Sequence, residues 1–119
     1  MRVRRIVANI AADRLDAASG FYGTLFDLEL VMDHGWIATY AAPTRSAPQI
    51  SIAIEAGSNA PFADISIEVD NFDEVLDRVE AAGHTIVYGP VVEPWGVRRF
   101  FMRDPFGRMI NVLEHAPAM

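Results

Sequence analysis

The side chains with the clearest chemical use form a polar ladder near the middle of the chain. Asp64, Ser66 and Glu68 alternate with three apolar residues, so all three share one face of an expected strand. Carboxylate and hydroxyl oxygens on one face can accept hydrogen bonds or pair with cations. The pattern predicts a polar wall, which faces either a ligand or plain water.

Aromatic and basic residues supply a second group of candidates. Trp36 and Tyr40 share one face of a strand by their spacing, and Trp95 lies in a Pro-Trp-Gly loop where an indole has little to cover it. Arg98 and Arg99 alternate in facing, so one of them can point into the groove, where it binds a carboxylate or a phosphate or closes a salt bridge, and the other is expected to be solvated. We expect these residues to line a ligand-binding groove, although packing by Trp95 within the protein explains its position almost equally well.

Composition excludes several function classes. The chain has no cysteine and no lysine, which removes thiolate, Schiff-base and P-loop chemistry. A net charge of -6 argues against non-specific nucleic-acid binding. No apolar run reaches the roughly 20 residues that cross a bilayer, so we expect a cytoplasmic protein with no membrane partner. The three histidines are expected at ordinary surface positions, with His115 beside Glu114 the least secure of these assignments.

An internal repeat indicates how these residues are positioned. Residues 4–31 and 63–89 each begin with an alternating strand, pass an Asp-x-x-Asp and enter an amphipathic helix. Asp13 and Asp70 are the expected N-caps, and Gly83 the expected end of the second helix. The expected buried residues of the two helices are Leu15, Ala18, Tyr22, Leu25, Phe26, Phe72, Val75, Leu76, Val79 and Ala82.

Three strand candidates follow each helix. In the second half, "DPFG" at 104–107 joins the last two strands, because proline fixes φ and glycine tolerates a positive φ. The adjacent Phe100 and Phe101 must point to opposite faces. The sequence therefore predicts an α+β fold of two tandem βαβββ modules, residues 1–57 and 62–115, forming a curved eight-stranded sheet. Residues 42–48 and 56–63 are the expected loops.

The motifs "FYGTLFDLEL" and "RDPFGRMINVLEH" resemble the vicinal-oxygen-chelate superfamily, which includes glyoxalase I, extradiol dioxygenases and bleomycin resistance proteins. The stretch "EPWGVRRFFMRDPFG" is most similar to the bleomycin-resistance-like branch. The resemblance implies that this chain has the paired-module fold of that superfamily.

The resemblance also implies where metal ligands would stand. The corresponding positions in this chain are Arg5, Ile52, Asp64 and Asn111. A guanidinium does not deprotonate and isoleucine has no donor atom, which leaves two single oxygen ligands. We therefore expect no divalent metal cofactor, and we expect Arg5 and Asp64 to form a charge-assisted hydrogen bond.

These observations lead to one preferred hypothesis. The protein is expected to be a metal-independent, homodimeric binding protein for a planar aromatic or cationic, antibiotic-like small molecule. Its expected ligand contacts are Trp36, Tyr40, Asp64, Glu68, Trp95, Arg98 and Arg99. The alternative is a metal-dependent glyoxalase-like lyase, isomerase or dioxygenase whose ligands lie at other positions. A purely structural dimer is a third interpretation.

Overall fold

A computed structural model describes residues 1–44 and 48–116 of the chain. Residues 45–47 of the expected 42–48 loop lie outside the described residues. Within those two ranges, no helix is both long enough and apolar enough to cross a membrane.

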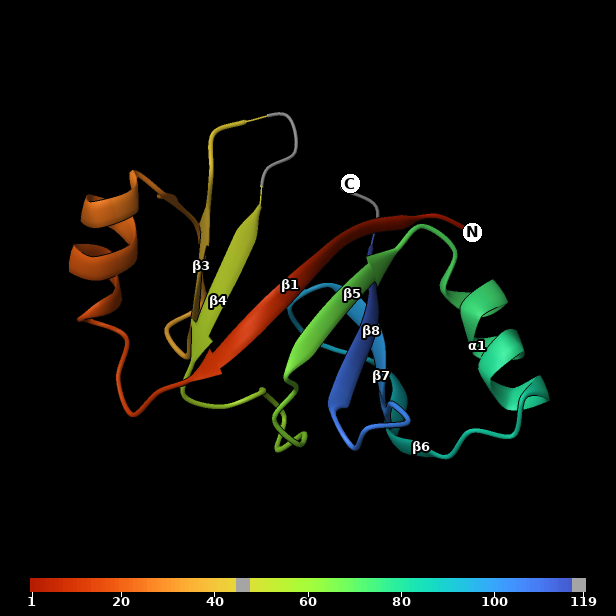
Figure 1. The fold of residues 1–119 in the computed structure, drawn as a ribbon. Helices are drawn as coiled ribbons and strands as arrows, with labels where there is room; N and C mark the ends of the chain where they lie inside the picture. Colours follow the sequence, from red (N-terminus) through yellow and green to blue (C-terminus); the bar gives the residue numbers. More distant parts are fainter. Residues whose placement is uncertain (45–47, 117–119) are drawn as a thin grey trace. The chain divides into compact units, whose positions relative to one another are not determined.

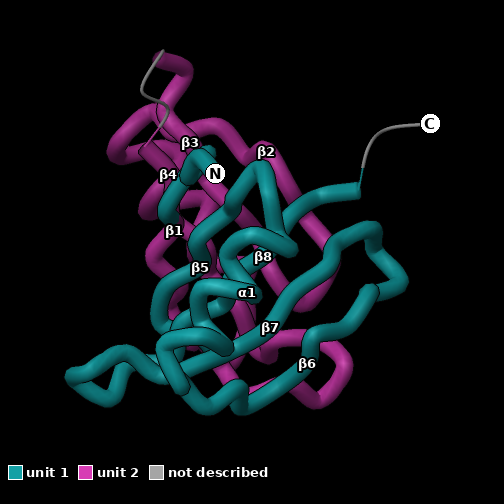
Figure 2. The backbone as a smooth tube through the Cα atoms, turned by 90° about the vertical axis from the view of Figure 1, so that its right-hand side faces the viewer, with its two compact units in different colours: residues 1–6, 63–119 teal, residues 7–62 magenta. Residues whose placement is uncertain are grey.

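The chain forms two compact units, which Figure 2 shows in teal and magenta. Unit 1 consists of residues 1–6 and 63–119, and unit 2 of residues 7–62. These two units differ from the expected modules at the N-terminus, because the first six residues group with the residues of the second module. Strand β1 (Val3–Ala11) accordingly contributes its first residues to unit 1 and the rest to unit 2.

Unit 1 is a four-stranded sheet with one helix, joined by the start of β1. Its strands follow the order β5-β8-β7-β6, with β5 parallel to β8 and the other neighbours antiparallel (Figure 1). The elements are β5 (Ile65–Val69), α1 (Phe72–Ala81), β6 (Ile86–Val92), β7 (Val97–Arg103) and β8 (Met109–His115).

Helix α1 begins one residue later than expected. Its N-cap is Asn71, whose side chain accepts a hydrogen bond from the Glu74 backbone N–H, at 3.1 Å. Asp70 instead accepts a hydrogen bond from the backbone N–H of Arg2, at 2.6 Å, because the start of β1 lies beside it. The helix ends as predicted, with Gly83 at φ +79°.

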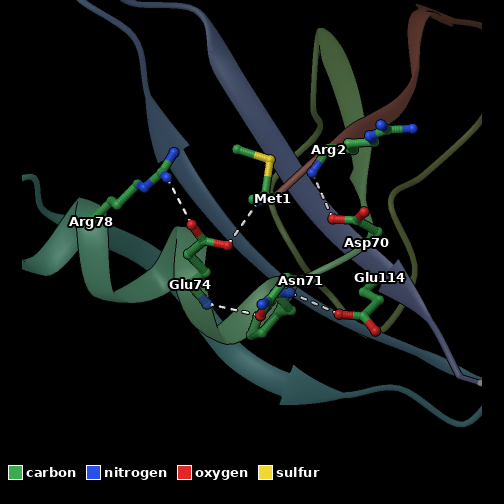
Figure 3. A network of polar contacts seen from close by, with 8 residues as sticks. Met1, Arg2, Asp70, Asn71, Glu74, Arg78 and Glu114 are labelled. Carbon is green, nitrogen blue, oxygen red and sulfur yellow. Dashed lines mark hydrogen bonds and ion pairs between the residues drawn. The ribbon is translucent and has the colours of Figure 1, made fainter.

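A polar network surrounds the first turn of α1 (Figure 3). The Met1 amino group lies 2.9 Å from a Glu74 carboxylate oxygen. Glu114 of β8 accepts a hydrogen bond from the Phe72 backbone N–H, at 2.7 Å. Carboxylates near the helix N-terminus satisfy its unpaired N–H groups and favour its positive end. The network therefore fixes α1 to β1 and β8.

The core of unit 1 lies between α1 and its sheet. Phe72 and Phe100 are fully buried, and their ring centroids lie 5.5 Å apart. Val75 and Leu76 are partly buried against this cluster, whereas Ala82 is exposed, contrary to expectation, because the helix has ended by that point. The buried members of the cluster are Val69, Phe72, Val79, Phe100, Ile110 and Val112.

The hairpin between β7 and β8 confirms the "DPFG" prediction. The backbone N–H of Gly107 donates to the carbonyl of Asp104 at 3.1 Å, and Gly107 has φ +86°. Phe100 and Phe101 point to opposite faces as expected, and both are buried.

Unit 2 has the strand order β2-β3-β4-β1, with β4 parallel to the end of β1. Its further strands are β2 (Glu29–Asp33), β3 (Ile37–Ala41) and β4 (Gln49–Ala53). Its buried core consists of Ala18, Ala38, Tyr40 and Ile52. Together, the eight strands and the single α-helix of the described residues confirm the α+β fold class.

The expected helix of unit 2 is instead a π-helix, η1 (Ser19–Thr24), without a side-chain cap. Asp13 therefore does not cap it. The prediction that Leu25 and Phe26 are buried is wrong, because they are 65% and 59% exposed. Glycine has low helix propensity, and the six-residue segment contains two glycines, which helps to explain why the repeat did not produce a second regular α-helix.

Candidate functional site

The sheet of unit 1 has a face turned away from α1, which we call the polar face. The apolar residues of β5 and β8 point into the core beneath α1, so their neighbours point the other way. This confirms the alternation expected for Ser66 and Glu68. The polar face carries Ser66, Glu68, Arg99, Phe101 and Asn111.

Glu68 is the centre of a charged cluster on the polar face. One carboxylate oxygen lies 2.5 Å from Arg5 Nε and the other lies 2.8 Å from His115 Nδ1. Burial raises the pKa of Glu68, but the hydrogen bond from His115 and the charges of Arg5 and His115 outweigh it and lower the pKa. His115, which we expected at an ordinary surface position, therefore belongs to this site.

The expected pair of Arg5 and Asp64 is replaced by the pair of Arg5 and Glu68. The backbone of Arg2 accepts a hydrogen bond from Asp70, so β1 and β5 run past each other in opposite directions. Arg5 therefore reaches the end of β5 that carries Glu68. Asp64 lies at the other end of β5, where it accepts a hydrogen bond from the Met109 backbone N–H at 3.1 Å.

Asn111 occupies the middle of the polar face and is 9% exposed. Its side-chain amide donates to Ser66 Oγ at 3.1 Å. Its Oδ1 atom is buried and has no hydrogen-bond partner among the residues that the structure describes. Leaving a buried acceptor unpaired costs about 1–3 kcal/mol, which a ligand with an N–H or O–H donor would recover.

Arg99 is held in a cage at the edge of this face. Its side chain is 5% exposed and its Nη2 lies 2.5 Å from a carboxylate oxygen of Glu93, which is 3% exposed. The same oxygen accepts a hydrogen bond from Tyr88, at 3.0 Å. The guanidinium carbon lies 4.9 Å from the ring centroids of both Trp95 and Phe101. In this cage Glu93 neutralises the charge of Arg99, and the Arg99 guanidinium packs against the ring of Trp95.

Glu93 and Tyr88 were not predicted from the sequence. Both belong to the β6–β7 hairpin, whose turn is closed by a hydrogen bond from the Glu93 N–H to the Val97 carbonyl, at 2.8 Å. A carboxylate immediately before the turn and an arginine shortly after it are the signal that could have indicated this ion pair.

Arg98 points to the opposite side of the sheet. It pairs with Asp73 of α1 at 2.8 Å and lies 4.6 Å from the Phe72 ring centroid. Arg98 therefore holds the helix on the sheet, and Arg99 is the member of the pair on the polar face.

The three predicted site residues of unit 2 are Trp36, Tyr40 and Ile52, and the structure places them in surroundings unlike the polar face of unit 1. Tyr40 and Ile52 are 4% and 5% exposed within the core beside η1. Trp36 precedes β3 and stacks on His34, with ring centroids 6.1 Å apart. On the opposite face of β3 and β4, the buried hydroxyls of Thr39 and Ser51 form a 2.7 Å hydrogen bond with each other.

The side chains at the expected metal positions do not fit a catalytic divalent metal ion. Arg5 is a cation paired with Glu68, Asp64 accepts a hydrogen bond from the Met109 backbone N–H, and Ile52 points into the core. Asn111 offers one neutral oxygen, where such metals generally need three or more ligands. Nowhere in residues 1–44 and 48–116 do three or more His, Cys, Asp or Glu side chains gather in a way that could hold a metal ion.

Comparisons with known proteins agree with this architecture. The family model described as "Glyoxalase/Bleomycin resistance protein/Dioxygenase superfamily" matches residues 4–112. No curated protein matches the sequence at a significant level.

Solved structures show the same fold at low sequence identity. An NAD-dependent benzaldehyde dehydrogenase from Legionella pneumophila has TM-score 0.74 and 15% identity, over 93% of this chain and 99% of that one. Methylmalonyl-CoA epimerase from Mycobacterium tuberculosis has TM-score 0.66 and 19% identity, over 97% and 88%. A glyoxalase/bleomycin resistance protein/dioxygenase superfamily member from Vibrio splendidus has TM-score 0.66 and 13% identity, over 95% and 99%.

Proposed function

Because the chain belongs to the glyoxalase/bleomycin resistance protein/dioxygenase superfamily, we propose that it binds a small planar organic molecule without a metal ion. The polar face of unit 1 is the binding surface. The observation that carries the proposal is the buried Oδ1 atom of Asn111, which has no hydrogen-bond partner among the described residues. A native protein rarely retains such an atom unless something pairs with it.

The neighbouring groups indicate the chemistry of the ligand. Glu68 and Glu93 are already neutralised by arginines, so the ligand needs no full positive charge to pair with them. The half-buried indole of Trp95 offers an aromatic surface. The ligand is therefore a planar molecule with an N–H or O–H donor, of the antibiotic-like class expected for the bleomycin-resistance-like branch.

Isothermal titration calorimetry in EDTA tests the proposal with a panel of planar aromatic amines, amides and phenols. We expect at least one compound to bind with 1:1 stoichiometry. Asn111→Leu is expected to weaken that binding about tenfold or more, because the donor of the ligand loses its acceptor. Thr39→Val is the matched control, since it removes a buried polar group from unit 2. Equal binding by both variants would contradict the assignment of the site.

The same titration distinguishes this function from the metal-dependent alternative. Nickel, zinc, manganese and iron(II) are titrated into the protein without EDTA. We expect no tight, stoichiometric binding, because the carboxylate of Glu68 is already paired on both oxygens. Tight binding of any of the four would favour a glyoxalase-like enzyme instead.

We also propose that the protein forms a homodimer. Exposed apolar side chains on η1, at its C-cap and on the edge strand β2 include Phe21, Leu25 and Leu30, each more than half exposed. Sedimentation velocity at micromolar concentration should give the mass of two chains. A 13.1 kDa species at all concentrations would contradict the dimer.

A further inference from the structure

Unit 2 contains an apolar pocket on the same side of its sheet as η1. Its volume is about 340 Å³, and apolar atoms make up nearly all of its wall. The lining residues are Tyr22, Phe26, Leu28, Pro48, Gln49 and Ile50. Tyr22, Leu28 and Ile50 also pack against the core of unit 2, so the pocket opens from that core toward the surface.

The local sequence explains why the described residues leave this space open. The π-helix η1 is only six residues long and buries none of its own side chains. Phe26, just beyond it, is 59% exposed although it forms one wall of the pocket. Its ring lies 6.4 Å from that of Tyr22. Short π-helical segments occur frequently at functional sites.

The size and lining of the pocket restrict its occupant. Small-molecule sites typically have volumes of about 300–1,000 Å³ and mostly apolar walls. A space of about 340 Å³ therefore suits a molecule with two fused rings or a short acyl chain. The only side-chain polar groups of the lining are the Tyr22 hydroxyl and the Gln49 amide.

We propose that this pocket is a second small-molecule site, which takes a largely apolar ligand with the size of a bicyclic ring system. It is distinct from the polar face of unit 1 and independent of the function proposed above. The ligand would contact Phe26, Leu28 and Ile50 and would cover the apolar surface that η1 leaves exposed.

Titration with 2-naphthol, followed by NMR of isoleucine and leucine methyl groups, tests the proposal. We expect saturable shifts of the Leu28 and Ile50 methyl signals, with half-saturation below about 1 mM for a ligand of this size. The signals of Ile67 and Leu76 in unit 1 are internal references and should not move.

Two exposed phenylalanines in different units provide a pair of variants. Phe26 lines the pocket and is 59% exposed, whereas Phe106 belongs to unit 1 and is 87% exposed. Phe26→Ala should weaken binding about three- to tenfold, in line with the worth of one aromatic contact. Phe106→Ala should leave the affinity unchanged. Both side chains are more than half exposed, so neither change is expected to prevent folding.

Several results would overturn the proposal. The first is that the methyl signals show no saturable shift up to the solubility limit of 2-naphthol. The second is that the methyl signals of unit 1 shift as much as those of Leu28 and Ile50. The third is that both alanine variants weaken binding equally. Shifts of Leu28 and Ile50 that depend on protein concentration without ligand, combined with loss of the 2-naphthol shifts at high protein concentration, would show instead that the homodimer covers this pocket.

Discussion

The buried ion pair of Arg99 and Glu93 gives a sharp test of how unit 1 is held together. Replacing Glu93 by Gln removes the carboxylate whose oxygen lies 2.5 Å from Arg99 Nη2. The Arg99 guanidinium then stays buried, at 5% exposure, without the negative charge of Glu93 beside it. Breaking a buried pair in this way costs about 3–5 kcal/mol.

The exposed pair of Arg98 and Asp73 is the matched control. Its two side chains are 42% and 71% exposed, so water screens their attraction. Asp73→Asn should therefore change stability far less than Glu93→Gln. Both variants lose one carboxylate charge and keep the volume of the side chain, so the comparison isolates the effect of burial.

Thermal denaturation followed by near-ultraviolet circular dichroism measures both effects. For a chain of this size the expected loss corresponds to a fall in Tm of roughly 10–20 °C for Glu93→Gln. The double variant Glu93→Leu, Arg99→Met should recover much of the loss, because it leaves no buried charge unpaired. A Glu93→Gln protein that is no less stable than Asp73→Asn would refute the reasoning.

Three further predictions follow from particular contacts. The pKa of Glu68 is lower in the folded protein than its ordinary value of 4.5, so its contribution to stability is present above that value. This contribution is lost as the pH falls through the lowered pKa, and Glu68→Gln should flatten the acid limb of a stability–pH curve. Gly89→Ala should be more destabilising in urea than Gly83→Ala. Both positions have positive φ, but only at Gly89 would the new Cβ lie 2.6 Å from a backbone oxygen, that of Arg99. Asn111→Leu removes an unpaired buried acceptor but also the hydrogen bond to Ser66 Oγ, so the two effects offset each other and the free energy of unfolding should change by less than about 1.5 kcal/mol; a large destabilisation would contradict that account.

Local patterns in the sequence were enough to predict most of unit 1. Alternation placed Phe100 and Phe101 on opposite faces, and Gly107 closed the β7–β8 turn as expected. These features depend on neighbouring residues only. The period-two pattern of a strand and the φ of a glycine do not require knowledge of the rest of the chain.

Features that depend on pairing between distant segments were predicted less well. Ile52 and Asn111 were expected at corresponding points of the two modules, but Ile52 points into the core of unit 2 and Asn111 lies on the polar face of unit 1. A shift of one residue is enough to turn a side chain to the other face of a sheet. The partner of Arg5 depends instead on the opposite directions of β1 and β5, which no local pattern in the sequence indicates.

The π-helix was missed for a different reason. Residues 15–26 have the apolar spacing of an amphipathic helix, and periodicity does not distinguish a regular α-helix from a wider one. The two glycines, Gly20 and Gly23, were the available signal. The apolar pocket in unit 2 lies beside this departure from regular structure.

The side-chain amide signal of Asn111, followed by NMR while a binding compound is titrated in EDTA, provides the most direct measurement. If Oδ1 of this residue accepts a hydrogen bond from the ligand, its amide resonances shift in proportion to occupancy and without added metal. Binding of the same compound that leaves these resonances unmoved, or that appears only after a divalent ion is added, would contradict a metal-free site on the polar face.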